Sequence, residues 1–258
     1  MDTGSIAGIA LAVIGILSGM MIEGGKISQI TQPTAALIVV GGTVGAVLLQ
    51  FPLPIFLAAV GKLSSIFMHR NSNDEAVLQQ LVEFANKARK SGIVSLDADL
   101  AAVEDPFLKQ ALMLAVDGTE PTELRKIMQL ELDNKSEYEE KLPQVFESAG
   151  GFSPTVGIIG AVLGLIQVMQ HLNDINEVGR GIAVAFVATI YGVGLANLFF
   201  LPVAGKLKIR HHKEMMARSM MLEGVISILE GMNPRMIELK LRTFLADGKP
   251  QSPHAEAA

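Results

Sequence analysis

Two long stretches without an ionisable side chain constrain this chain more than any other feature. Phe152–Gln170 and Gly181–Ala204 contain no Asp, Glu, Lys, Arg or His. A helix rises about 1.5 Å per residue, so each stretch can cross the roughly 30 Å hydrocarbon core of a membrane. The segment between them, residues 171–180, carries polar and charged side chains. The pattern therefore predicts two membrane-spanning helices joined by a short hairpin.

Two further apolar runs precede this hairpin. Ile6–Ile22 has no Lys or Arg before it and is followed by a second run, about Thr34–Ala59. This arrangement favours a retained membrane span over a cleaved signal peptide. The FPLP sequence at residues 51–54 is expected to end or kink the second span. The chain is therefore expected to cross the membrane four times.

The rest of the chain is expected to form helices in water. Residues 62–147 and those after 205 place apolar side chains at helical spacing and show no strand pattern. Gly92 is a natural stop for the first of these helices. The expected helices are Asp74–Lys90, Ser95–Val103, Phe107–Val116, a long charged helix from Pro121 or Thr122 into the third span, Glu214–Leu229 and Pro234–Leu245.

These elements predict an all-α membrane protein. It has four transmembrane helices, a helical cytoplasmic loop domain and a helical cytoplasmic C-terminal tail. The predicted parts are residues 1–61 with transmembrane helices 1 and 2, 62–150 with the loop domain, 151–205 with transmembrane helices 3 and 4, and 206–258 with the C-terminal helices and a disordered end.

Basic residues set the predicted orientation. Lys62, His69 and Arg70 flank the second span, and the cluster Lys206–Lys213 flanks the fourth, whereas the two hairpins are poor in basic side chains. Cytoplasmic flanks of membrane spans are enriched in Lys and Arg. Both termini and the large loop are therefore expected in the cytoplasm.

The composition argues against several classes of function. A net charge of −5 argues against nucleic acid as a partner, and the absence of Cys excludes disulfides and thiolate chemistry. The five histidines show neither metal-ligand nor nucleophile–base spacing. They are His69, His171, His211, His212 and His254. We therefore expect no enzyme, no catalytic residue, no metal and no cofactor, and read the glycines at 157, 160 and 164 as helix-packing positions.

The third and fourth spans contain polar groups suited to an ion path but no carboxylate. An ion path normally uses a carboxylate at membrane depth, so a partner has to supply it. The hydroxyls of Thr155 and Thr189 are candidates to bind an ion or order water, or each donates back to its own helix. Pro154 and Pro202 are expected at similar depth near the cytoplasmic side, either as hinges or as helix ends.

Three stretches resemble one known family. They are SPTVGIIGAVLGLI at 153–166, GIAVAFVATIYGVGLANLFFLPVAGKLK at 181–208 and ARKSGIVSLD at 88–97. Together with the order of spans and loop, they resemble the A subunit of the bacterial flagellar motor stator, the MotA/PomA branch of the MotA/TolQ/ExbB proton-channel family. The resemblance covers nearly the whole chain up to about Phe244.

The resemblance implies an architecture and a set of partners. Five A subunits surround two single-span B subunits in the bacterial inner membrane. The B subunit binds peptidoglycan and supplies an essential Asp, and a passing proton or sodium ion drives torque. The cytoplasmic loop engages the rotor protein FliG through charges. Membrane lipid surrounds the ring, and the choice between proton and sodium stays open.

The same resemblance assigns roles to individual residues. Arg89 and Asp97 match the rotor-binding charges of the family, although Asp stands where Glu is more usual, and Lys90 shares the basic role. Pro154 and Pro202 match the prolines that couple ion passage to cytoplasmic movement. Thr155 and Thr189 match threonines proposed near the sodium path. The alternatives are a TolQ/ExbB-like proton-channel energiser of an envelope protein, whose relatives have three spans, and a non-conducting membrane scaffold.

Overall fold

The computed structural model describes residues 2–67 and 74–245, and within these ranges the chain is helical with no strand. The predicted all-helical fold is confirmed, and four of the described helices are long and apolar enough to cross a membrane. His69, Arg70, His254 and the predicted disordered end, residues 247–258, lie outside the described residues. The elements are α1 Thr3–Ile22, α2 Ile27–Ile30, α3 Pro33–Gln50, α4 Leu53–Phe67, α5 Asp74–Ser91, the 3-10 helix η1 Ile93–Ala102, α6 Pro106–Val116, α7 Pro121–Gln170, α8 Ile175–Leu195, the π-helix η2 Ala196–Phe200, α9 Leu201–Leu229 and α10 Pro234–Leu245.

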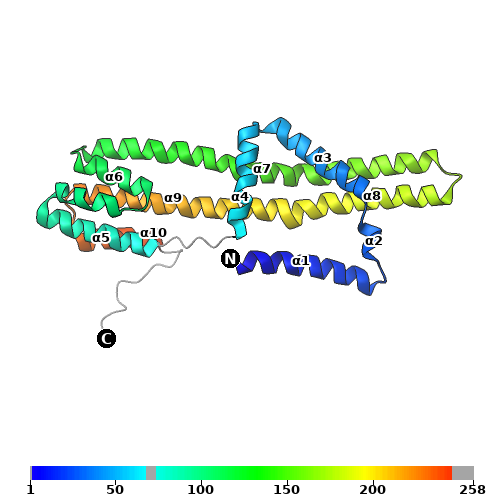
Figure 1. Ribbon diagram of the computed structural model, residues 1–258, viewed down its shortest axis with the longest axis horizontal. Helices are drawn as coiled ribbons and strands as arrows, with labels where there is room; N and C mark the ends of the chain where they lie inside the picture. The colour runs from blue at the N-terminus through cyan, green and yellow to red at the C-terminus, as the bar shows by residue number, and fades with distance from the viewer. Residues whose placement is uncertain (1, 68–73, 246–258) are drawn as a thin grey trace. The chain divides into compact units, whose positions relative to one another are not determined.

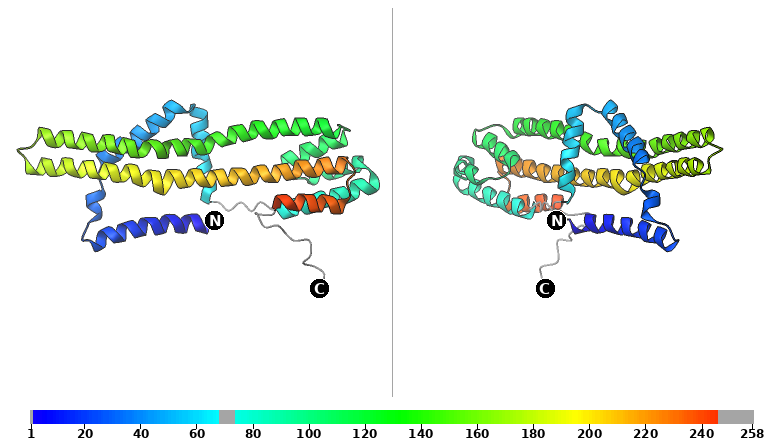
Figure 2. Two further views of the ribbon diagram at one scale, coloured as in Figure 1. Left: turned by 180° about the vertical axis from the view of Figure 1, so that it is seen from behind. Right: turned by 45° about the vertical axis from the view of Figure 1, so that its right-hand side comes forward.

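The chain folds as two compact units, each built from segments far apart in sequence. One unit contains Met1–Arg70 and Glu139–Ile209, and the other contains Asn71–Tyr138 and Arg210–Ala258. In the first unit, α7 and the run of α8, η2 and α9 lie alongside each other in both views of Figure 2, with α3 crossing them obliquely. The second unit combines the loop helices with the C-terminal helices.

The second predicted span is divided into two helices at the FPLP sequence, where an end or a kink is expected. α3 ends at Gln50 and α4 begins at Leu53, so the run expected over 34–59 is interrupted at Phe51 and Pro52. Proline has no N–H and its ring clashes with the preceding helical turn. At the end of α3, the N–H of Phe51 donates to the carbonyl of Val47 at 2.9 Å. The apolar run continues beyond this break because α4 is itself largely apolar.

The helix α1 is the least packed of the described spans. None of its residues is buried, and it packs mainly against α4. The carboxylate of Asp2 caps the helix by accepting from the N–H of Ser5 at 3.2 Å and also pairs with the ammonium group of Lys206 on α9. In the isolated chain, α1 is therefore held more by a polar contact at its start than by packing along its length. Figure 1 shows α1 as a helix apart from α7 and α8.

A continuous core holds the C-terminal end of α3 against α4, α7 and α9. Its members are buried apolar side chains, and charged pairs lie nearby: Lys62 with Glu139 at 2.7 Å and Lys208 with Glu147 at 2.6 Å. Lys62, predicted to flank the second span, lies in α4. The buried members are Val47, Ala59, Ile66, Leu142, Val145, Phe146, Ala149, Val203, Ala204 and Leu207.

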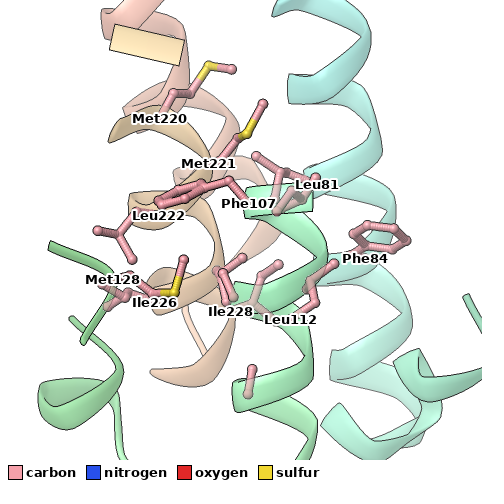
Figure 3. Packing of buried hydrophobic residues seen from close by; sticks show 14 of the residues in the cluster. Leu81, Phe84, Phe107, Leu112, Met128, Met220, Met221, Leu222, Ile226 and Ile228 are labelled. Carbon is pink, nitrogen blue, oxygen red and sulfur yellow. The ribbon is translucent and has the colours of Figure 1, made fainter. Parts of the chain in front are cut away.

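The second unit has its own apolar core. Figure 3 shows side chains from α5, α6, α7 and α9 interdigitating, with Phe107 of α6 beside Leu222 and Met221 of α9. The predicted loop helices and α10 are found with similar bounds, and Gly92 ends α5 with a φ of 81°. The C-terminal methionines therefore pack with the loop helices instead of forming a separate tail. Truncating such a buried side chain to Ala costs about 2–5 kcal/mol.

A charged cluster ties three helices of this second unit together. Glu223 of α9, whose side chain is 17% exposed, accepts two hydrogen bonds from the guanidinium group of Arg125 on α7, at 2.9 and 3.3 Å. It also accepts from the ammonium group of Lys240 on α10. Burial alone would raise the pKa of Glu223, but the hydrogen bonds from Arg125 and Lys240 outweigh burial and lower it.

Candidate functional site

The hairpin of α7 and α8 is held together by glycine backbone contacts. A Cβ added to Gly164 would lie 2.7 Å from the carbonyl oxygen of Gly181, and one added to Gly157 would lie 2.8 Å from that of Ala188. Such distances are shorter than real Cβ contacts, so only glycine permits this approach. Small residues allow membrane helices to pack this closely. The glycines predicted to pack helices, 157, 160 and 164, all lie at this contact.

The hairpin turn is set by a capping residue. Asp174 precedes α8, and its carboxylate accepts from the N–H of Asn176 at 2.9 Å. Asp and Asn at this position satisfy helix N–H groups that lack partners within the helix. The turn therefore fixes where α8 begins, and the glycine contacts then fix how closely it follows α7.

Thr155 and Thr189 lie on these two helices, with Thr155 exposed and Thr189 half-buried. The hydroxyl of Thr155 donates to the carbonyl of Phe152 at 2.8 Å, and that of Thr189 donates to the carbonyl of Ala185 at 3.2 Å. In the isolated chain both hydroxyls therefore bond their own helix. A hydroxyl oxygen also has two acceptor lone pairs, so each can still face an ion or a water molecule.

The two prolines lie inside helices rather than at their ends. Pro154 is internal to α7, and Pro202 follows the π-helix η2 in a run that continues from α8 to Leu229. The sequence left open whether the two prolines are hinges or helix ends, and the prediction of a helix end is therefore wrong for both prolines. Internal prolines and π-helical turns are the usual causes of kinks in helices.

The predicted rotor-binding charges gather around one turn of the second unit. Arg89 and Lys90 close α5, Asp97 lies in η1, and all three side chains are exposed. Within the described part of the chain, Arg89 and Asp97 form no ion pair, whereas the neighbouring Lys87 and Asp99 pair at 2.7 Å. The fold therefore leaves Arg89 and Asp97 available to another molecule.

Two residues in the first unit make contacts that have no signal in the sequence. The hydroxyl of Tyr191 on α8 donates to the carbonyl of Ile30 at 2.5 Å and accepts from the N–H of Gln32 at 3.2 Å. The hydroxyl of Ser153 on α7 donates to the carbonyl of Gly192 at 3.0 Å. Both residues stand out in sequence only as polar groups inside apolar runs, and nothing there identifies their partners.

Comparisons with known proteins point to one family. Residues 99–220 match the MotA/TolQ/ExbB proton channel family, and residues 6–92 match the motility protein A N-terminal family. Motility protein A of Bacillus subtilis is 36% identical over 250 residues, which cover 95% of this chain and 91% of that protein.

Solved structures give the same result. The C. jejuni MotAB structure contains a chain with a TM-score of 0.91 and 31% identity, covering 98% of this chain and all of that one. The flagellar MotAB stator complex from Bacillus subtilis contains a chain with a TM-score of 0.86 and 34% identity, covering 95% of this chain and 97% of that one. The resemblance found from residues 88–97, 153–166 and 181–208 is confirmed, and the chain belongs to the motility protein A branch of the MotA/TolQ/ExbB proton channel family.

Proposed function

We propose that this chain is the A subunit of a flagellar motor stator, which couples the inward flow of protons or sodium ions to rotation of the flagellar rotor. The observation that carries the proposal is similarity along nearly the whole chain to one chain of two MotAB structures. The four apolar helices and the exposed charges of the second unit supply the two working parts of such a machine, a membrane path and a contact surface.

The partner in this proposal is a single-span B subunit. Residues 152–170 and 181–204 carry no carboxylate, and an ion path at membrane depth needs one. The B helix supplies that group. Large apolar side chains on the outer faces of α7 and α8, among them Ile158, Val162, Phe186 and Val193, are exposed in the isolated chain. In the assembly these side chains are covered by neighbouring copies of this chain in a ring, which the resemblance gives as five, by the B helices and by membrane lipid.

Thr155 and Thr189 line the ion path in this proposal. Their hydroxyl protons are used within their own helices, so their oxygens face the path as acceptors. An acceptor is what a sodium ion or a proton-carrying water requires. Two hydroxyls of this kind serve either ion.

Pro154 and Pro202 transmit ion passage to the cytoplasmic part of the chain. Each removes one regular backbone hydrogen bond from a helix that continues beyond the membrane. Bending is easiest where that bond is missing. A change at the ion path then alters the direction in which α7 and α9 leave the membrane.

Arg89, Lys90 and Asp97 contact the rotor protein FliG. Exposed ion pairs contribute about 0–1 kcal/mol each. A single contact is therefore weak, sensitive to salt and quickly remade, which suits a machine that steps. In this proposal the second unit and both termini lie in the cytoplasm, and the membrane is the bacterial inner membrane.

The proposal is tested by co-expressing the chain with its B subunit. The resemblance implies that a plug segment of B closes the resting complex. With that segment deleted, cells are expected to show growth inhibition that depends on the external ion, and Thr189→Val should weaken it. Absence of any ion-dependent effect would favour a scaffold. Conduction without rescue of motility in cells lacking their own stator would favour an energiser of another envelope protein.

A further inference from the structure

A polar contact lies directly beside one of the two coupling prolines. Ser153, which precedes Pro154, is fully buried, and its hydroxyl donates to the carbonyl of Gly192 at 3.0 Å. Serines in membrane helices often donate to a carbonyl of their own helix, as Ser18 does to Gly15 at 3.2 Å. The hydrogen bond of Ser153 instead joins α7 to α8.

The backbones of the two helices touch at the same place. A Cβ added to Gly192 would lie 2.6 Å from the carbonyl oxygen of Ser153 and 3.2 Å from the Cα of Pro154. No side chain separates the helices there. A movement of α8 at Gly192 must therefore either carry α7 with it or break the contact.

Both helices are weakened close to this contact. Pro154 has no N–H to donate to the carbonyl of Gly150. A Cβ added to Gly150 would lie 2.6 Å from the Cδ2 atom of Leu201, the residue before Pro202. The N–H of Leu201 bonds the carbonyl of Ala196 in a π-helical pattern. The two helices thus depart from regular hydrogen bonding where they lie against each other.

We propose that Ser153 is a positioning residue that keeps α7 in register with α8 at this point. Its hydrogen bond passes a displacement of α8 near Thr189 to α7 on the cytoplasmic side of Pro154. The inference rests on the proposed function, because it takes Thr189 as part of the ion path and both prolines as coupling elements. Glycine contacts fix how close two helices come, whereas a directional hydrogen bond also fixes their register.

The expected signature is a loss of coupling without a loss of conduction. Ser153→Ala removes the hydroxyl and leaves the glycine packing in place. The helices should then slip at Gly192, so ions still pass while less of their movement reaches the cytoplasmic side. Ser153→Cys has a similar size and a weak donor, and it should fall between the wild type and Ser153→Ala. Ser18→Ala is the matched control, since among the described residues its hydroxyl bonds only within α1.

The experiment uses the chain with its B subunit and measures two quantities for each variant. One is motor torque at high load in cells lacking their own stator. The other is ion current into vesicles containing the complex with the plug segment of B deleted. For Ser153→Ala, torque should fall about twofold or more, while current per assembled complex stays within about 1.5-fold of wild type.

Other outcomes overturn the inference. Unchanged torque, a proportional fall in torque and current, or a fall in the amount of assembled complex would each show that Ser153 does not act by transmission. A torque loss in Ser153→Cys equal to that in Ser153→Ala, or a similar loss in Ser18→Ala, would do the same. If the wild-type complex neither conducts nor drives rotation, the proposed function fails first, and this result is distinguishable because it needs no variant.

Discussion

The hydroxyl of Tyr191 in the middle of the fourth span donates to the carbonyl of Ile30, at a distance of 2.5 Å. The same oxygen accepts from the N–H of Gln32, the residue that precedes α3. One side chain of α8 therefore satisfies two backbone groups of the connector between α1 and α3. These groups would otherwise need water or another partner.

Tyr191→Phe is expected to loosen the start of α3 without changing the apolar packing around the aromatic ring of residue 191. The loss of stability should be about 0.5–1.5 kcal/mol, the usual net worth of a hydrogen bond. Thermal unfolding of the purified complex and hydrogen exchange at Gln32 would measure it. The matched control is Tyr138→Phe, because Tyr138 is exposed and makes no hydrogen bond within the described part of the chain. Equal effects of the two substitutions would contradict the account.

Gly164→Ala is expected to separate α7 from α8. Its Cβ would lie 2.7 Å from the carbonyl oxygen of Gly181 and 2.9 Å from the N atom of Ala185, and neither backbone atom can turn away. Overpacking of this kind costs about 1–3 kcal/mol. Gly194→Ala on α8 meets no atom within 4 Å and serves as the control in the same hairpin. Thermal unfolding should rank Gly164→Ala below wild type and leave Gly194→Ala at or slightly above it; the opposite order would refute this packing.

The helical spans and loop helices could be predicted because their signals are local. Charge-free runs, amphipathic spacing and stops such as Gly92 lie within a few residues of the elements they define. The break at Pro52 is predicted by the FPLP sequence for the same reason, although the apolar run itself continues to Ala59. The course of α4 after this break depends on its packing in a core shared with α7 and α9, and no local signal records that packing.

The partners of single polar side chains could not be predicted. Ser153 and Tyr191 bond backbone groups 39 and 161 residues away, respectively. Any backbone carbonyl can accept such a bond, so the sequence carries no mark of which one does. The choice follows from how α3, α7 and α8 are rotated against each other. The inclusion of Met220 and Met221 in the core of the loop helices depends on packing in the same way.

The stability of the second unit should depend on the ionisation of Glu223. The pKa of this carboxyl is lowered in the folded chain, so its ion pairs stabilise the fold above the ordinary pKa of about 4.3 and are lost as pH falls through the lowered value. Glu223→Gln should therefore cost about 1–2 kcal/mol near neutral pH. The difference from wild type should shrink below about pH 4.

Thermal unfolding between pH 8 and about pH 2.5 would measure this dependence. The control is Glu83→Gln, which alters an exposed carboxylate on α5 that has no ion pair within the described residues. A cost of Glu223→Gln that is constant over the whole range, or that grows as the pH falls, would contradict the role assigned to Arg125 and Lys240.

Reversing the charge of Arg89 should weaken the rotor contact while leaving the fold intact. Arg89 is exposed and has no ion pair within the described part of the chain, so Arg89→Asp breaks no ion pair there and turns the proposed attraction to FliG into repulsion. One exposed pair is worth about 0–1 kcal/mol, so binding should weaken by up to about fivefold, and swimming should slow without stopping. Reversing the acidic partner on FliG should restore part of the speed.

Two results would count against this surface. Full motility with Arg89→Asp and Asp97→Lys together would show that the rotor contact lies elsewhere. A slowing equal to that of Lys126→Asp would show a general effect of charge, because Lys126 is an exposed residue of α7 that pairs with Glu123.

The central claim is that the charge-free stretches at residues 152–170 and 181–204 shelter an ion route whose titratable acid belongs to another polypeptide. Ion flux into vesicles containing either the purified chain alone or its complex with the plug-deleted B subunit tests the claim most directly. The account predicts flux for the complex and none above background for the chain alone. Equal flux in the two preparations would contradict it.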